Sequence, residues 1–245
     1  MAACCAACGA TFAEFTVLCH SVTLVTLWAL VYQVFCFLAR AATKTSMDFI
    51  FDIIIVIFSA VLHEVSHGLA ARALGDKTAE RAGRLTLNPL VHLDLYGSIL
   101  LPLGLWFLSG GTFFFAAAKP VPYNPYNLKN QQWGPAAVGA AGPITNLVLA
   151  ILFALVARGF GVNSAIAYIA VRVVIINCSL AIFNLVPIPP LDGSKILLAL
   201  LPVRYDYIKY KLERYGFFAV LILVFFFGQY ITVPVEALAR LLLGA

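Results

Sequence analysis

The chain has 245 residues, of which 62% are hydrophobic and only 11% are charged, and its net charge is +5. Soluble domains are roughly a quarter charged, so this composition excludes an ordinary soluble protein and indicates a polytopic membrane protein. The basic residues form no run interleaved with aromatic residues, so we expect no nucleic-acid partner.

The first predicted element is an apolar helix at residues 15–39, which follows a tail that carries Cys4, Cys5 and Cys8. The helix is too long for the apolar region of a typical signal peptide and has no basic segment before it, so we expect it to be retained. The cysteines have no matching cluster elsewhere, so they indicate no disulfide framework. A disordered or modified tail is favoured over lipidation or metal capture.

Four further apolar stretches, at residues 49–74, 136–157, 165–186 and 215–235, reach the roughly 20 residues that a membrane-spanning helix needs. Residues 96–108 are too few to cross and contain Pro102 and Gly104, which is typical of a re-entrant or interfacial segment. Short strand-like runs at 84–87 and 113–116 predict hairpin-like strands that could pair with an unwound substrate. The expected fold is therefore an all-α polytopic membrane protein with about five transmembrane helices, a re-entrant or interfacial segment and short β-hairpin-like strands.

The second stretch contains His63-Glu64-Val65-Ser66-His67, which fits the pattern H-E-x-x-H. On a helix this spacing puts the two imidazoles one turn apart on the same face, where both can bind one ion. Zinc suits the pair because it binds neutral imidazole readily, and Glu64 would then accept the proton of a water molecule. The alternative is a polar patch for helix packing, although two His and one Glu exceed what packing requires.

A catalytic zinc site normally has three protein ligands and one open position, so a third ligand is needed. Among the eleven acidic residues, Asp192 stands out because it directly follows an apolar helix and a proline-rich break at residues 184–191. Prolines force an extended path and Gly193 relaxes it, so the carboxylate can turn back toward the bilayer.

Three motifs resemble the site-2 protease family of intramembrane zinc metalloproteases, namely HEVSHG at 63–68, AGPITNL at 141–147 and FNLVPIPPLDG at 183–193. The resemblance implies that His63, His67 and Asp192 bind one zinc ion and that Glu64 is the general base. It is closest to the compact prokaryotic-type branch, since the chain has no room for a PDZ or cystathionine-synthase-like (CBS) domain.

The same motifs contain two asparagines that are candidate substrate-binding residues. The resemblance points to Asn184 as a group that holds the substrate carbonyl or its oxyanion, and the alternative is a tie to a neighbouring helix. Asn146 has a structural interpretation beside the substrate-facing one. The single membrane-embedded protease domain at 1–245 would comprise a tail at 1–14, an accessory first helix at 15–47, a catalytic core at 48–193 and a C-terminal loop and helix at 194–245.

The direction of the helices follows if His63 and Asp192 share one ion. The helices at 49–74 and 165–186 must then run in the same direction, and the helix at 136–157 must run in the opposite one. Eleven Lys and Arg residues fall on the side of the site and four on the other, which are Arg40, Lys44, Arg158 and Arg240. We therefore expect a multi-pass protein of a bacterial-type cell membrane, with the site open toward the cytosolic side.

The expected function is zinc-dependent hydrolysis of peptide bonds in membrane-spanning protein substrates. A zinc or proton transporter also buries His and acidic residues, but transporters usually spread them over several helices and show repeats. A catalytically inactive relative is a third interpretation, and the intact Glu64 argues against it. His92 and Asp94 could line a water path or belong to a solvated loop.

Overall fold

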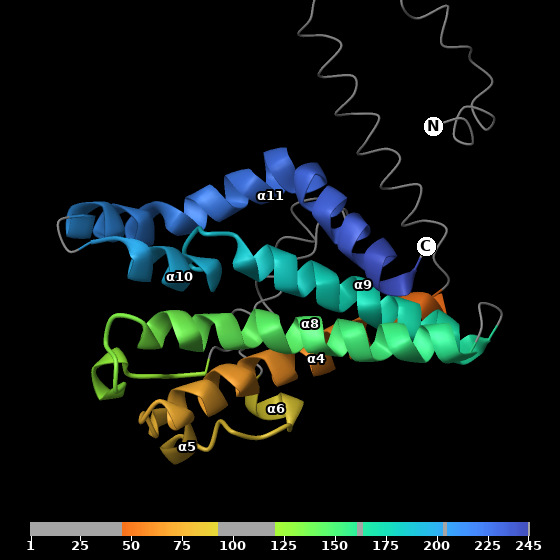
Figure 1. Ribbon diagram of the computed structural model, residues 1–245, viewed down its shortest axis with the longest axis horizontal. Helices are drawn as coiled ribbons and strands as arrows, with labels where there is room; N and C mark the ends of the chain where they lie inside the picture. Colours follow the sequence, from red (N-terminus) through yellow and green to blue (C-terminus); the bar gives the residue numbers. More distant parts are fainter. Residues whose placement is uncertain (1–45, 93–120, 161–163, 203–204, 245) are drawn as a thin grey trace, which may run out of the picture. The chain divides into compact units, whose positions relative to one another are not determined.

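A computed structural model of the protein describes residues 46–92, 121–160, 164–202 and 205–244 (Figure 1). The chain divides into two compact units, residues 1–49 and 50–245, and the elements below belong to the second, apart from the first turn of one helix. The expected tail and first helix and the segment at 96–108 lie outside the described residues.

The described residues are mostly helical. The long helices are α4 (Ser46–Ala73), α8 (Gly134–Phe160), α9 (Ala165–Leu185) and α11 (Asp206–Leu243). The short ones are α5 (Thr78–Arg81), α6 (Pro89–His92), the 3₁₀ helix η2 (Pro125–Asn127) and α10 (Gly193–Leu200). The expected hairpin-like strands are not confirmed, because residues 84–88 have no regular structure, residues 113–116 are not described and no strand occurs in the described part.

Four described helices are long and apolar enough to cross a membrane, where the sequence predicted about five in the whole chain. Their candidate spans are Ile50–Ala73, Gly134–Phe160, Ala165–Leu185 and Phe226–Leu243. The last lies further along the chain than the expected 215–235, and both ranges belong to the one long helix α11. Figure 1 shows α11 bent partway along, and Pro234 within it removes one intrahelical hydrogen bond.

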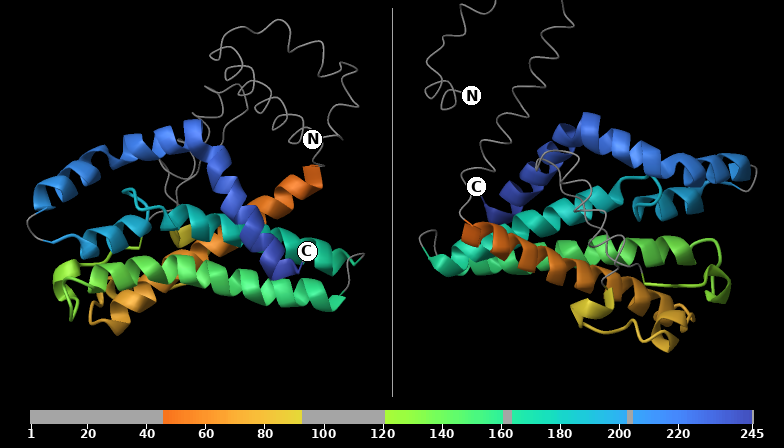
Figure 2. Two further views of the ribbon diagram at one scale, coloured as in Figure 1. Left: turned by 45° about the horizontal axis from the view of Figure 1, so that its top comes forward. Right: turned by 180° about the vertical axis from the view of Figure 1, so that it is seen from behind.

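The helices that matter for the site alternate in direction. Figures 1 and 2 show α4 and α9 running the same way and α8 running the opposite way, as the shared-ion argument requires. Small residues line the contact of α8, α9 and α11, where they let helix backbones approach closely. They are Ala150, Ala154, Val174, Cys178, Val235 and Ala239.

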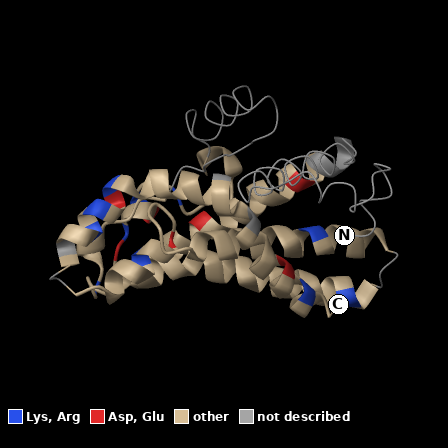
Figure 3. Cartoon of the chain, turned by 90° about the horizontal axis from the view of Figure 1, so that it is seen from above, with Lys and Arg blue, Asp and Glu red and all other residues tan. Residues whose placement is uncertain are grey.

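The outer faces of these helices are apolar. Large hydrophobic side chains such as Phe58 on α4, Leu155 on α8 and Phe226 on α11 are more than half exposed. Charged residues lie mainly toward the ends of the helices, with long uncharged stretches between (Figure 3). Such surfaces are unstable in water and match a hydrocarbon environment.

Two polar contacts tie α4 to α9. Arg172 of α9 forms a two-pronged ion pair with Asp52 of α4, with nitrogen–oxygen distances of 2.6 and 2.8 Å. One helical turn before His63, the Ser59 hydroxyl accepts a hydrogen bond from the Asn177 amide at 3.0 Å. In an apolar surrounding these contacts favour one alignment of α4 against α9, whose end leads to Asp192.

The loop after α4 is organised around Asp76. Gly75 lies two residues after the end of α4, and its φ of +111° is accessible to glycine at little cost. The carboxylate of Asp76 is fully buried and accepts hydrogen bonds from the amide and hydroxyl of Thr78, the Asn124 amide and the Asn127 side chain. These hydrogen bonds hold the segment before η2 against the end of α4.

Low pH should weaken the stabilisation that the hydrogen bonds of Asp76 provide. Burial alone would raise the pKa of Asp76, but the hydrogen bonds from Thr78, Asn127 and Asn124 outweigh it and lower the pKa from 3.8 to about 2. A group whose pKa is lower in the folded state stabilises the fold above its unfolded pKa, and the stabilisation disappears as the pH falls through its folded pKa. The stability difference between wild type and Asp76→Asn should therefore shrink between about pH 4 and pH 2.

This difference can be measured from thermal unfolding of the detergent-purified protein. At pH 6 we expect Asp76→Asn to lose about 1–3 kcal/mol, the usual effect of leaving buried polar groups without partners. Glu80→Gln is the matched control, because that carboxylate is well exposed and its ion pair with Arg72 should contribute little. A difference between wild type and Asp76→Asn that stays constant down to pH 2 would contradict this role.

Candidate metal centre

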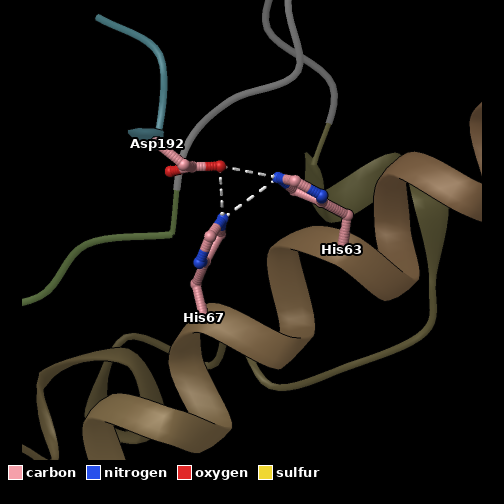
Figure 4. A group of neighbouring side chains, drawn as sticks. All are labelled: His63, His67 and Asp192. Carbon is pink, nitrogen blue, oxygen red and sulfur yellow. Dashed lines mark hydrogen bonds and ion pairs between the residues drawn. The ribbon is translucent and has the colours of Figure 1, made fainter. Parts of the chain in front are cut away.

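Three side chains from two distant parts of the chain meet between α4 and the start of α10 (Figure 4). His63 Nε2 lies 3.0 Å from Asp192 Oδ2, and His67 Nε2 lies 3.1 Å from the same oxygen. The two Nε2 atoms are 3.1 Å apart. The helical spacing of four residues puts both rings on one face of α4, and both point at the carboxylate.

The donor set fits a zinc ion. Tetrahedral zinc with ligands at roughly 2.0–2.1 Å holds its ligand atoms about 3.3 Å apart, close to the separations seen here. All three residues are buried, with exposed fractions of 6% for each histidine and 7% for Asp192 as whole residues. Two neutral imidazoles and one carboxylate are a common ligand set of catalytic zinc sites.

Each imidazole has a partner on its other nitrogen. His67 Nδ1 donates a hydrogen bond to the backbone carbonyl of Val138 on α8 at 2.6 Å. This bond places the ring proton on Nδ1 and leaves the lone pair of Nε2 for a metal. The backbone of α8 thus selects the tautomer that a ligand needs.

Asn146 of α8 occupies the corresponding position behind His63. Its side-chain nitrogen lies 3.2 Å from His63 Nδ1, and its oxygen Oδ1 is buried without a hydrogen-bond partner among the described residues. A half-turn of this amide would bring Oδ1 to His63 Nδ1. That orientation satisfies the buried oxygen and gives His63 the tautomer that binds metal through Nε2.

Glycines let the backbone come close to these rings. A Cβ atom on Gly142 of α8 would lie 2.5–2.6 Å from ring atoms of His63 and His67, including both Nε2 atoms. A Cβ atom on Gly193 would lie 2.1 Å from the carbonyl oxygen of Leu185. Gly142 therefore leaves the space beside the ligand atoms free, and Gly193 lets the start of α10 pack against the end of α9.

Asp192 directly precedes α10, and its side chain makes no capping hydrogen bond to the first backbone amides of that helix. Its Oδ2 faces the histidines, whereas its Oδ1 accepts a hydrogen bond from Lys195 Nζ at 2.9 Å. Burial alone would raise the pKa of Asp192, but the adjacent imidazoles of His63 and His67 and the charge of Lys195 hold it well below its ordinary value. The carboxylate is therefore ionised, as a metal ligand must be.

The Glu64 side chain points in a different direction from the side chains of His63 and His67. It is half-buried, and its Oε2 accepts a hydrogen bond from the backbone amide of Val121 at 3.0 Å. Within the described residues it is not part of the cluster of potential ligand atoms. An uncoordinated carboxylate beside a metal site can act as a base, whereas a ligand carboxylate cannot do so freely.

The other residues singled out in the sequence lie as follows. The Asn184 side chain donates to the carbonyl of Leu180 in its own helix at 3.0 Å, and Asn146 lies behind His63 rather than in an open position. His92 is buried, at 2% exposure, with Nε2 near the Thr86 carbonyl, so it is not in a solvated loop. Asp94 lies outside the described residues.

Sequence reasoning overlooked two contacts of the site. The first is Lys195, which its position three residues after Asp192, at the start of a helix, could have suggested. The second is the Val121 amide that holds Glu64, a backbone group for which no residue pattern exists.

The chain is similar in sequence to known zinc metalloproteases. The model of the family described as "Peptidase family M50" matches residues 51–174 and 161–227. "Putative zinc metalloprotease YwhC" of Bacillus subtilis is 36% identical over 195 residues, which cover 74% of this chain and 84% of the relative. "Putative zinc metalloprotease MJ0611" of Methanocaldococcus jannaschii is 33% identical, over 61% of this chain and 70% of the relative. No solved structure is significantly similar to the chain.

Proposed function

Because the chain belongs to peptidase family M50, the site-2 protease family, and is thus a zinc-dependent hydrolase of peptide bonds, we propose that it cleaves transmembrane segments of other proteins within the bilayer. His63, His67 and Asp192 bind the single zinc ion in this proposal. Glu64 is the general base. The observation that carries it is the convergence of two imidazole nitrogens and one carboxylate oxygen, within 3.1 Å of one another, among helices apolar enough to span a membrane.

The chemistry divides between the metal and the protein. Bound zinc supplies a Lewis acid that polarises the scissile carbonyl and lowers the pKa of water. Glu64 accepts the proton of the attacking water and later donates it to the leaving amine. A carboxylate has two oxygens, so Glu64 can keep the hydrogen bond from the Val121 amide on Oε2 and still accept one from water.

Two asparagines have proposed roles beside the ligands. Asn184 holds the substrate carbonyl or its oxyanion through one N–H of its amide, while the other donates to the Leu180 carbonyl. Asn146 is fully buried against His63, so we assign it to the orientation of that ligand rather than to contact with substrate.

The membrane setting supports a substrate that is itself embedded. His63 and His67 lie in the second half of α4, after a stretch of the helix whose large side chains are exposed. A protease in this position reaches segments that soluble proteases cannot reach. We further propose a multi-pass arrangement with the site open toward the cytosolic side, which the excess of positive charge on that side supports.

Reconstitution with a defined substrate tests this proposal. Purified protein in liposomes, incubated with a panel of single-span membrane proteins, should release products whose new termini lie inside the apolar segment. Mass spectrometry of the products locates the cleaved bond. An unfolded soluble polypeptide serves as the control and should be cleaved far more slowly, because it does not partition into the bilayer.

Two outcomes would contradict the proposal. Cleavage only in the loops outside the apolar segments would indicate an ordinary membrane-anchored peptidase. Zinc uptake into liposomes without any cleavage would favour the transporter interpretation, which the family membership argues against.

A further inference from the structure

The outer oxygen of Asp192 has its own partner. Lys195 Nζ lies 2.9 Å from Oδ1, while Oδ2 lies 3.0 and 3.1 Å from the two histidines. The two oxygens of one carboxylate therefore face different groups, with a cation on one side and the ligand nitrogens on the other. The side chain of Asp192 is 9% exposed and that of Lys195 is 27% exposed.

Lys195 is held in this position by the surrounding structure. A Cβ atom on Gly139 of α8 would lie 2.9–3.0 Å from the Lys195 side chain and from the Asp192 carbonyl, so only glycine leaves room for the lysine stem there. On another side the ammonium lies 5.5 Å from the centre of the Tyr123 ring, a cation–π distance. Three contacts, to α8, to Tyr123 and to Asp192, thus restrict a side chain that is usually mobile.

The Tyr123 contact connects Lys195 to the general base. Tyr123 lies in the segment 121–124, whose first amide donates to Glu64 and whose last amide donates to Asp76. Lys195 also lines a cavity of about 450 Å³, together with Tyr123, Pro189 and Phe217. Lys195 therefore contacts the ligand carboxylate of Asp192 and the segment 121–124, which binds Glu64. It also borders this cavity.

We propose that Lys195 is a positioning residue that keeps Asp192 a one-oxygen ligand of the zinc ion. The proposal rests on the function proposed above. A carboxylate can bind a metal through one oxygen or both, and binding through both would fill the position that the substrate needs. Because Lys195 engages Oδ1, only Oδ2 is available to the metal, and the fourth position stays open.

Two substitutions separate charge from packing. Lys195→Met keeps the long apolar stem against Gly139 and Tyr123 but removes the cation, whereas Lys195→Arg keeps the cation. Lys211→Met is the matched control, because Lys211 also lies over a tyrosine ring, at 4.6 Å from Tyr207, but on α11 and away from Asp192. Each protein is purified in detergent, and its zinc affinity is measured by competition with a chelator.

Lys195→Met should lower zinc affinity by about 10–100-fold, the range found when an outer partner of a ligand is removed. Lys195→Arg should restore most of it, and Lys211→Met should match wild type. The visible spectrum of the cobalt-substituted protein gives a second measurement. Wild type should show the intense absorption of four-coordinate cobalt, and Lys195→Met should show the weaker absorption of a higher coordination number.

Wild-type zinc affinity and an unchanged cobalt spectrum in Lys195→Met would overturn the proposal, as would a Lys195→Arg protein that behaves like Lys195→Met. These outcomes would overturn only the role of Lys195. The proposed function would stand as long as His67→Ala loses zinc. A wild-type protein whose zinc affinity equals that of His67→Ala would overturn both, because the ion would then lie elsewhere.

Discussion

Replacing Glu64 with Gln should leave zinc bound and lower the rate of substrate cleavage on the order of 10²–10⁴-fold, the contribution of a positioned general base. Glutamine has the shape of glutamate, and its side-chain oxygen can still accept the hydrogen bond from the Val121 amide. It cannot accept a proton from water at neutral pH. The change therefore removes the proposed chemistry while it preserves the local structure.

The measurement compares initial cleavage rates of one membrane-spanning substrate in liposomes, with zinc content determined on the same samples. Glu80→Gln is a suitable control, because Glu80 is an exposed carboxylate on α5 outside the ligand cluster, and its cleavage rate should equal that of wild type. Cleavage by Glu64→Gln at a rate near that of wild type, with zinc retained, would remove Glu64 from the mechanism.

Replacing Asp192 with Asn should have the largest effect on the metal itself. The substitution keeps the size of the side chain but replaces an anionic oxygen with a neutral one, so the ion loses its only charged ligand in the cluster. Loss of an outer partner lowers affinity about 10–100-fold, so loss of a ligand should lower it by more than roughly 100-fold. Cleavage should disappear with the zinc.

Chelator competition measures the zinc affinity, and two further variants provide reference values for comparison. Asp76→Asn changes an equally buried carboxylate outside the cluster and should leave zinc affinity unchanged. Asn146→Leu removes the partner behind His63 and should show an intermediate loss. An Asp192→Asn protein that binds zinc as tightly as Asp76→Asn would show that another residue is the third ligand.

Hydropathy located the membrane helices well but not their ends. The stretch expected at 136–157 is α8 at 134–160, and the stretch expected at 165–186 is α9 at 165–185. The difference is larger for α11, which begins at Asp206 although residues 206–214 are too charged to count as a span. Hydropathy indicates which residues can contact lipid, whereas a helix continues for as long as its backbone hydrogen bonds continue.

The ligand cluster was predictable because its members have a spacing or a chain context. His63 and His67 follow from the helical period, and Asp192 follows from a proline-rich break after an apolar helix. Their partners were not predictable in this way. The Val138 carbonyl lies 71 residues from His67, and Asn146 lies 83 residues from His63, so these contacts depend on how α8 packs against α4.

Asn146 shows the limit of motif reasoning. The GPITN pattern marked it as a candidate, but the choice between a substrate contact and a structural role needs its surroundings. Its complete burial and its position 3.2 Å from His63 Nδ1 favour the orientation of a ligand. The motif also does not explain why residue 142 is glycine, whereas the structure does, because a Cβ atom there would touch both imidazoles.

The shared ion itself is tested most directly by zinc K-edge X-ray absorption of the purified wild-type protein. Nitrogen and oxygen ligands at about 2.0–2.1 Å, with the outer-shell scattering of two imidazoles, are the result expected for His63, His67 and Asp192. Sulfur at about 2.3 Å would contradict it, because the six cysteines would then supply the ligands.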